Sequence, residues 1–302
     1  MMKQIKIDKR KQKRTADLIL KAANQDGITE TKIRNLFLFK DTTPENRTLQ
    51  VYDPSIVIAV QGKKDVFIEE LQFEYGEGMF LATLLPVPLE CVVTEGSPEK
   101  PLLGLAFALD KTRLSKLMVK MNIQNEPEIN LDKINTSSIF SAPLNNEILD
   151  AAFRLMTILA DPMEATVLGD AIMDEICFRV LRNEQEGVLT YLLQQKGQIH
   201  QISKAVEMIH NNLEKPLNVD DLANLVNLSR SRFHTKFKEV MHLSPLQYAK
   251  SIKLTKARDY IAKGKNISET GYLVGYNSPA QFSREYKRYF GMSPSEHNRG
   301  SN

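Results

Sequence analysis

Two segments near the carboxyl end of the chain place hydrogen-bond donors and small side chains along one side of a predicted helix. In the first segment these residues are Ser231, Arg232, His234, Thr235 and Lys238, and in the second they are Ala280, Gln281, Ser283, Arg284 and Lys287. Donors of this kind can bind base edges in the major groove of DNA and the phosphates beside it. Any one of them could be a solvated surface residue, but the whole set favours contact with a nucleic acid. Arg284 is the strongest candidate for a base contact, because a guanidinium can bind guanine at two points.

The two segments are copies of one unit. SRFHTKFKEVMHLSP at 231–245 returns as AQFSREYKRYFGMSP at 280–294, with a constant offset of 49 residues. A repeat of this length usually marks a duplicated supersecondary unit. On the side opposite the donors, large apolar residues lie at helical spacing and are predicted to form the core. They are Phe233, Phe237, Val240 and Met241 in the first copy, and Phe282, Tyr286, Tyr289 and Phe290 in the second.

Each copy begins with a shorter predicted helix and a turn, which is the layout of a helix-turn-helix motif. Asn218 and Asn266 are of a residue type that caps helices at their N-termini. Turns are predicted at Asn227 and Gly275, because Asn and Gly tolerate a left-handed backbone.

The predicted motifs cover about 219–241 and 267–290, and a linker helix over 244–263 joins them. Ser244 is placed to cap this linker helix, and Pro245 suits its first position. Its length of about 28 Å is comparable with the roughly 34 Å between successive major grooves on one face of DNA. A single chain could therefore read two adjacent groove segments.

The basic excess of the chain is confined to the repeat region. Residues 198–302 hold 16 Lys and Arg against 9 Asp and Glu, a balance of +7, whereas residues 1–197 hold 24 against 28, a balance of −4. A surface that faces phosphates needs such an excess. Seven Lys and Arg among the first 14 residues mark 1–30 as a basic polar tail. A disordered solubilising tail is favoured over one that contacts nucleic acid.

Residues 31–197 are predicted to form a separate domain. Between residues 33 and 110, short segments rich in Val, Ile, Leu and Phe alternate with turn sequences, which indicates six or more strands and a sandwich or barrel. Helical spacing of apolar residues follows at 110–120, 144–160 and 164–182. The predicted fold class is α+β and multidomain, with an all-α double helix-turn-helix domain at 198–302.

The region from about 202 to 299 resembles the AraC/XylS family of bacterial transcription regulators, most clearly in VGYNSPAQFSREYKRYFG and in the linker KSIKLTKARDYIAKG. The resemblance implies sequence-specific binding of double-stranded DNA, activation of transcription and RNA polymerase as a partner. The base-contact positions that it implies are Ser231, His234, Thr235, Ala280, Ser283 and Arg284. Contacts with the DNA backbone are predicted at Arg230, Arg232, Lys238, Gln281, Lys287 and Arg288. The chain departs from the family at Asn227, where Gly is frequent, and at Gly271, where Ala is usual.

The β-rich half is similar to the cupin-like N-terminal domain found in one branch of this family. The similarity runs through YDPSIVIAVQGKKDVFI and the segment from Glu74 to Asp110. It implies a module that senses a small-molecule effector or supports a homodimer, and it does not name a ligand.

An enzyme fused to a DNA reader and an architectural DNA-binding protein are the alternative hypotheses. All five histidines follow residue 197, so the predicted barrel lacks the histidines of a metal-dependent cupin. Glu69 and Glu70 would point to opposite faces of a strand. Cys91 with a distant histidine is a weak nucleophile candidate, and no phosphate loop, dinucleotide fingerprint or nucleophile elbow is present. We therefore expect no enzymatic activity, metal or cofactor.

The sequence also leads us to expect a cytoplasmic protein without a membrane partner. Apolar runs are shorter than the roughly 18 residues that a spanning helix needs, and the first residues lack the apolar core of a secretory signal.

Overall fold

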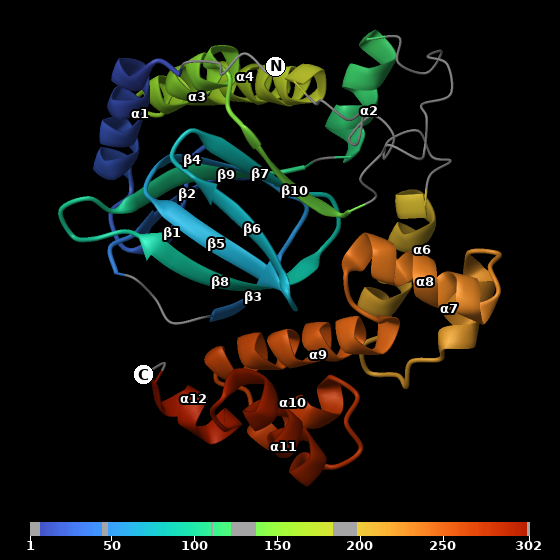
Figure 1. The fold of residues 1–302 in the computed structure, drawn as a ribbon. Helices are drawn as coiled ribbons and strands as arrows, with labels where there is room; N and C mark the ends of the chain where they lie inside the picture. The colour runs from blue at the N-terminus through green and yellow to red at the C-terminus, as the bar shows by residue number, and fades with distance from the viewer. Residues whose placement is uncertain (1–6, 44–47, 110, 122–136, 184–197, 301–302) are drawn as a thin grey trace. The chain divides into compact units, whose positions relative to one another are not determined.

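The computed structural model describes residues 7–43, 48–109, 111–121, 137–183 and 198–300. These residues form two compact units, one built mostly from the chain before residue 198 and the other from residue 198 onward (Figure 1). The first unit contains two sheets and several helices, and the second is helical. The predicted fold class is thereby confirmed. Among the described residues, no helix is both long and apolar enough to cross a membrane.

The first unit is built on two sheets whose strand order follows antiparallel pairing. The larger sheet has the order β1-β2-β9-β4-β7-β10, and the smaller has the order β3-β8-β5-β6. The larger sheet contains β1 (Gly27–Glu30), β2 (Leu36–Asp41), β9 (Leu102–Ala108), β4 (Ser55–Gln61), β7 (Met79–Thr83) and β10 (Ile139–Pro143). The smaller sheet contains β3 (Thr48–Tyr52), β8 (Val87–Glu95), β5 (Lys63–Ile68) and β6 (Leu71–Gly76). The six strand segments predicted from the sequence all form strands.

The two sheets are connected by a turn that only glycine can form. Gly62 lies between β4 and β5 with a left-handed backbone (φ +78°), and a Cβ there would lie 2.5 Å from the carbonyl oxygen of Glu95. Other residues would meet both backbone strain and a steric clash at this position. The turn therefore directs the chain from the larger sheet into the smaller one.

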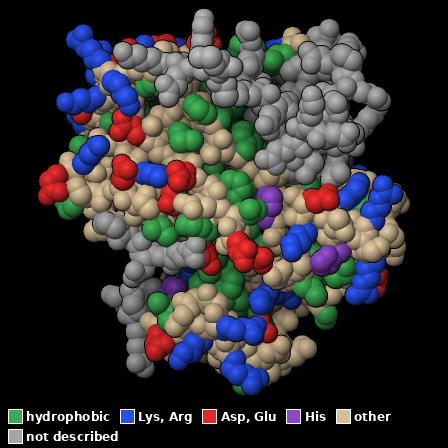
Figure 2. Space-filling view, viewed as in Figure 1, with side chains coloured by type: hydrophobic (Ala, Val, Ile, Leu, Met, Phe, Trp, Pro, Cys, Tyr) green, Lys and Arg blue, Asp and Glu red, His purple; other side chains and the backbone are tan. Residues whose placement is uncertain are grey.

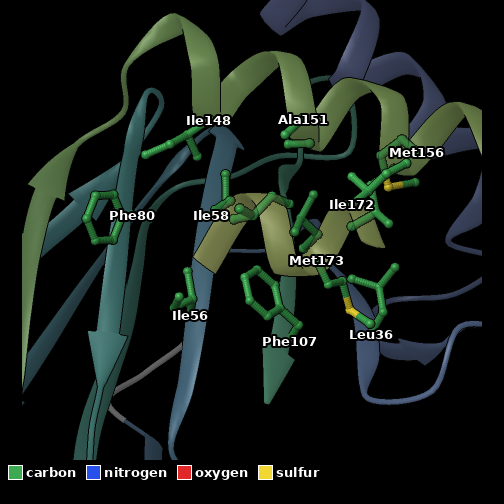
Figure 3. Close-up of a cluster of buried hydrophobic side chains, with 14 of the residues drawn as sticks. Leu36, Ile56, Ile58, Phe80, Phe107, Ile148, Ala151, Met156, Ile172 and Met173 are labelled. Carbon is green, nitrogen blue, oxygen red and sulfur yellow. The ribbon is translucent and has the colours of Figure 1, made fainter. Parts of the chain in front are cut away.

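Helices pack on the larger sheet and form the core of the first unit with it (Figure 1). These helices are α1 (Lys9–Ala22), α3 (Asn146–Ile158) and α4 (Pro162–Asn183). Figure 3 shows Ile148, Ala151 and Met156 of α3 pointing toward side chains of the strands, with Ile172 and Met173 of α4 in the same cluster. The strands contribute Leu36, Ile56, Ile58, Phe80 and Phe107. The helices predicted at 144–160 and 164–182 are thus confirmed to within about two residues at their ends.

The helix α2 (Lys111–Lys120) is attached to α4 by charge. Arg113 is largely buried, and its guanidinium lies 2.8 Å from a carboxylate oxygen of Asp170 and 2.9 Å from one of Asp174. Two carboxylates around one guanidinium satisfy several of its fixed donors at once. The segment predicted as helical at 110–120 therefore forms the expected helix and is anchored at its start.

The prediction of a disordered basic tail at 1–30 is wrong for the part that the structure describes. The helix α1 begins after the N-cap residue Asp8, and β1 pairs with β2. Ile19 is fully buried, and the side chain of Gln12 donates a 2.9 Å hydrogen bond to the carbonyl of Val60. The prediction relied on the many Lys and Arg residues and overlooked the apolar residues on one side of the helix. One such apolar stripe is enough to bury that face. Residues 1–6 lie outside the described residues.

The second unit repeats a short helix followed by a longer one. The first pair is α7 (Val219–Leu225) and α8 (Arg230–Met241), and the second pair is α10 (Ile267–Leu273) and α11 (Pro279–Phe290). The linker helix α9 (Pro245–Ala262) joins them. Ser244 and Gln247 form a capping box at its start, as the sequence leads one to expect from a serine before Pro245.

Two further helices flank the motifs, α6 (Gln198–Asn211) and α12 (Pro294–Gly300). The sequence of 194–201 reads as a polar junction, yet α6 begins at Gln198. The sequence pattern that indicates α6 is the spacing of Ile199, Ile202, Val206 and Ile209, which are all buried. That spacing is the three- and four-residue period of a helix with one buried face.

Candidate nucleic-acid interface

Caps and turns give the two motifs the same local geometry. The side chain of Asn218 accepts a 3.0 Å hydrogen bond from the backbone of Asp220, and that of Asn266 accepts from the backbone of Ser268 at 2.9 Å. The turn residue Asn227 has φ 55°, and Gly275 has φ 81°. Both left-handed turns that the sequence predicts are confirmed.

Replacing Asn227 with Ala should destabilise the second unit by about 1 kcal/mol, because Ala meets the full steric penalty of a left-handed backbone. Asn227→Gly should be neutral or slightly stabilising at the same position. Thermal unfolding of the full chain measures both. The control is Asn224→Ala, an exposed position within α7 where Ala favours the helix. Equal destabilisation by the two Ala variants would contradict the role of the turn.

The longer helix of each motif buries an aromatic face. Phe233, Phe237, Val240 and Met241 of α8 are buried, and the rings of Phe233 and Phe237 meet at 5.6 Å. In α11 the rings of Phe282 and Tyr286 also meet at 5.6 Å. The predicted core faces are confirmed for these residues, whereas Tyr289 and Phe290 are only partly buried.

Small residues let the shorter helix approach the longer one. Gly271 in α10 is buried, and a Cβ at this position would lie 3.1 Å from the ring of Phe282. This is closer than ordinary contact, so Ala at this position would require a small adjustment of the ring. Burial raises the pKa of Tyr286 to about 12, and its hydroxyl lies 3.2 Å from Nδ1 of His297 in α12.

The predicted DNA contacts lie on the side of α8 and α11 away from these buried rings. Among the base-contact candidates, Ser231, His234, Thr235, Ala280 and Arg284 are exposed and Ser283 is half-buried. The backbone-contact candidates are all exposed, namely Arg230, Arg232, Lys238, Gln281, Lys287 and Arg288. Figure 2 shows Lys and Arg side chains gathered over the α7–α8 region and over the α10–α11 region. The two helices therefore each present a cationic surface that carries small hydrogen-bonding residues.

Some of these side chains already have partners. A guanidinium nitrogen of Arg230 lies 3.2 Å from a carboxylate oxygen of Asp220, and one of Arg288 lies 3.8 Å from Glu285. The hydroxyl of Thr235 donates to the carbonyl of Ser231 at 3.2 Å. Exposed ion pairs of this type contribute little stability. A phosphate can therefore replace Asp220 or Glu285 as the partner at small cost.

The first unit offers a partly buried polar cluster and an open apolar groove. Sγ of Cys91 lies 3.7 Å from the hydroxyl of Tyr52, and burial raises the pKa of both Tyr52 and Tyr75. The groove, with a volume of about 440 Å³, lies between α3 and α4 and is lined by residues that include Phe153 and Leu168. Within the described ranges, no three His, Cys, Asp or Glu side chains come together as a metal site requires.

A β-sheet unit followed by two helix-turn-helix motifs defines a DNA-binding regulator. The model of the AraC-type transcriptional regulator N-terminus matches residues 32–188, more than half of the chain, and a helix-turn-helix domain model matches residues 222–300. The chain therefore belongs to the AraC family of transcriptional regulators.

Two curated relatives come from Pseudomonas aeruginosa. The regulator GbdR is 30% identical over 135 residues, which cover 44% of this chain and 37% of GbdR. The regulator ArgR is 28% identical over 148 residues, which cover 48% of this chain and 45% of ArgR. The match thus spans less than half the length of each of these relatives.

The fold is shared with ToxT of Vibrio cholerae. An apo ToxT variant aligns with a TM-score of 0.59 over 92% of this chain and 100% of that chain, at 11% identity. A ToxT structure with bound unsaturated fatty acid aligns with a TM-score of 0.57 over 87% of this chain and 94% of that chain, also at 11% identity. At this level of identity the similarity concerns the fold alone.

Proposed function

We propose that this chain is a sequence-specific transcriptional regulator that reads two adjacent major-groove segments with α8 and α11. The observation that carries the proposal is the division of each helix into a buried aromatic side and an exposed side of donors and cations. A helix in a major groove needs both sides, one to hold it on the protein and one to contact bases and phosphates.

The linker helix supports reading of two segments by one chain. The 18 residues of α9 span about 27 Å, and successive major grooves on one face of DNA are roughly 34 Å apart. The net charge of +7 over 198–302 supplies attraction to phosphates that does not depend on sequence. Base contacts from Ser231, His234 and Thr235 would then select one segment, and those from Ala280, Ser283 and Arg284 the other.

The first unit is proposed to regulate this binding. Membership of the AraC family favours a role as an activator that contacts RNA polymerase, and a unit that senses a small-molecule effector or supports a homodimer. The fatty acid bound to ToxT supports an effector for a chain of the same fold. Comparing the DNA affinity of the full chain with and without candidate effectors tests this role, and an unchanged affinity with every candidate would count against it.

Replacing Arg284 with Ala should weaken binding by about 1–3 kcal/mol at the cognate site, because a bidentate contact to guanine is lost. The loss should be confined to one base position. Fluorescence anisotropy with a selected duplex and its single-base variants measures this. Arg288→Ala is the matched control, since loss of a phosphate contact should weaken binding to all sequences alike.

The alternative function is architectural DNA binding without sequence preference. In that case Arg284→Ala would lower affinity for every duplex equally. A scrambled competitor duplex would also displace the bound, labelled duplex as effectively as an unlabelled copy of the selected duplex. Either result would contradict the proposed base contact.

A further inference from the structure

The second helix-turn-helix motif has a point of attachment to the first half of the unit besides the linker helix. Gly275, the turn residue of the second motif, faces the loop that connects α6 to α7 beside the first motif. A Cβ at Gly275 would lie 2.6 Å from the carbonyl oxygen of Leu213 and 2.7 Å from that of Glu214. The backbones of the turn and of the loop are therefore in close contact.

Both sides of this contact are held by local hydrogen bonds. In the loop, the backbone of Lys215 donates to the carbonyl of Asn212 at 3.1 Å, and the side chain of Asn212 donates to the carbonyl of Met208 at 2.9 Å. In the turn, the backbone of Gly275 donates to the carbonyl of Tyr272 at 2.9 Å. A movement of one motif against the other would therefore have to break the contact itself.

Lys253 closes the contact from the linker helix. It lies at the middle of α9, and its ammonium donates a 3.2 Å hydrogen bond to the carbonyl of Lys215. The same Nζ would lie 2.7 Å from a Cβ at Gly275. Burial lowers the pKa of Lys253, and the charge of Glu214 opposes this effect. The ammonium thus contacts both the loop and the turn.

The linker helix packs on a different motif on each side of Lys253. On the amino-terminal side, the rings of Tyr248 and Phe237 meet edge to face with centroids 5.6 Å apart. On the carboxyl-terminal side, Leu254, Ala257 and Ile261 share a buried cluster with Phe282. The contact of Lys253 with the loop and the turn therefore lies where the helix passes from one motif to the other.

We propose that Lys253 and Gly275 are positioning residues that lock the angle between the two reading helices and so set the distance between the two DNA segments the chain accepts. This inference rests on the proposed reading of two groove segments. If the linker helix were the only connection between the motifs, it could bend or twist and change the angle between the reading helices. A second point of attachment prevents this movement. Each added base pair moves the second segment by about 3.4 Å and turns it by about 35°, so a locked pair of helices accepts one spacing.

The test measures spacing preference with the full chain. A pool of random-sequence duplex is selected with the wild type, and one to three base pairs are then inserted between the two conserved blocks. The wild type should lose roughly tenfold or more in affinity for each insertion, because the DNA must deform to fit. Lys253→Met and Gly275→Ala should each lose less than about threefold per insertion, because the helices can now adjust.

Matched controls separate the contact from general strain. Gly264 also has a left-handed backbone (φ 80°), but a Cβ there would have no atom within 4 Å, so Gly264→Ala should keep the wild-type spacing preference. Lys256→Met, at an exposed position of the same helix, should keep it as well. Thermal unfolding identifies any variant that does not fold. If Gly275→Ala does not fold, the Lys253→Met variant alone decides the result.

Two outcomes would overturn the inference, and they are distinguishable. If the wild type selects only one conserved block, the proposed reading of two segments fails and the spacing lock fails with it. If the wild type selects two blocks but a folded Lys253→Met variant keeps the sharp spacing preference, only the lock fails.

Discussion

Raising the salt concentration from about 50 to 200 mM should weaken DNA binding by this chain roughly 10²–10³-fold. The candidate backbone contacts include five exposed cations, namely Arg230, Arg232, Lys238, Lys287 and Arg288. Each cation that neutralises a phosphate releases counterions, so five contacts give a slope of about −4.5 for log K against log of the salt concentration. Anisotropy titrations of a selected duplex over this range measure the slope.

Single variants test which cations contribute to that slope. Lys287→Ala should reduce its magnitude by about 0.9 and weaken all sequences similarly. Lys100→Ala serves as the control, since Lys100 is an exposed lysine of the first unit. A slope near zero in the wild type would exclude a phosphate-facing role for these surfaces.

Replacing Ile19 with Ala should lower the free energy of unfolding of the first unit by about 2–5 kcal/mol. Ile19 is fully buried in the cluster that α1 shares with the larger sheet, so the substitution removes apolar contacts and leaves a cavity. Thermal or urea-induced unfolding of the full chain, followed through the sheet signal in circular dichroism, measures the loss.

The neighbouring residue provides the control for this prediction. Leu20 is 45% exposed, so Leu20→Ala should change stability by less than about 1 kcal/mol. A first unit whose stability is unaffected by Ile19→Ala would support the disordered tail that the basic composition suggested.

Much of the second unit could be predicted because its signals are local. The repeat places Phe233 and Phe282 at equivalent positions, and one helical period separates the buried side from the exposed side of each helix. The turns at Asn227 and Gly275 depend on which residues tolerate a left-handed backbone, and this is a property of the residue itself. The exposure of Arg284 and Lys287 follows from the same periodicity.

The first unit was harder to predict because strand pairing joins distant parts of the chain. The strand β10 pairs with β7, more than fifty residues earlier in the chain, and its short sequence has no clear period. The polar strands β3 and β6 were missed for a related reason, since their neighbours and not their own composition stabilise them. In α1, the six basic residues of the helix outweighed a narrow apolar stripe.

From its sequence alone, this protein could be assigned two reading helices, their buried faces, their turns and their basic charge, because residue type and helical period determine these within a few residues. Only the tertiary structure revealed that α1 belongs to the core and that Lys253 and Gly275 meet the loop between α6 and α7. Both depend on contacts between residues more than twenty positions apart, and the free energy of such contacts comes from partners that a local pattern does not identify.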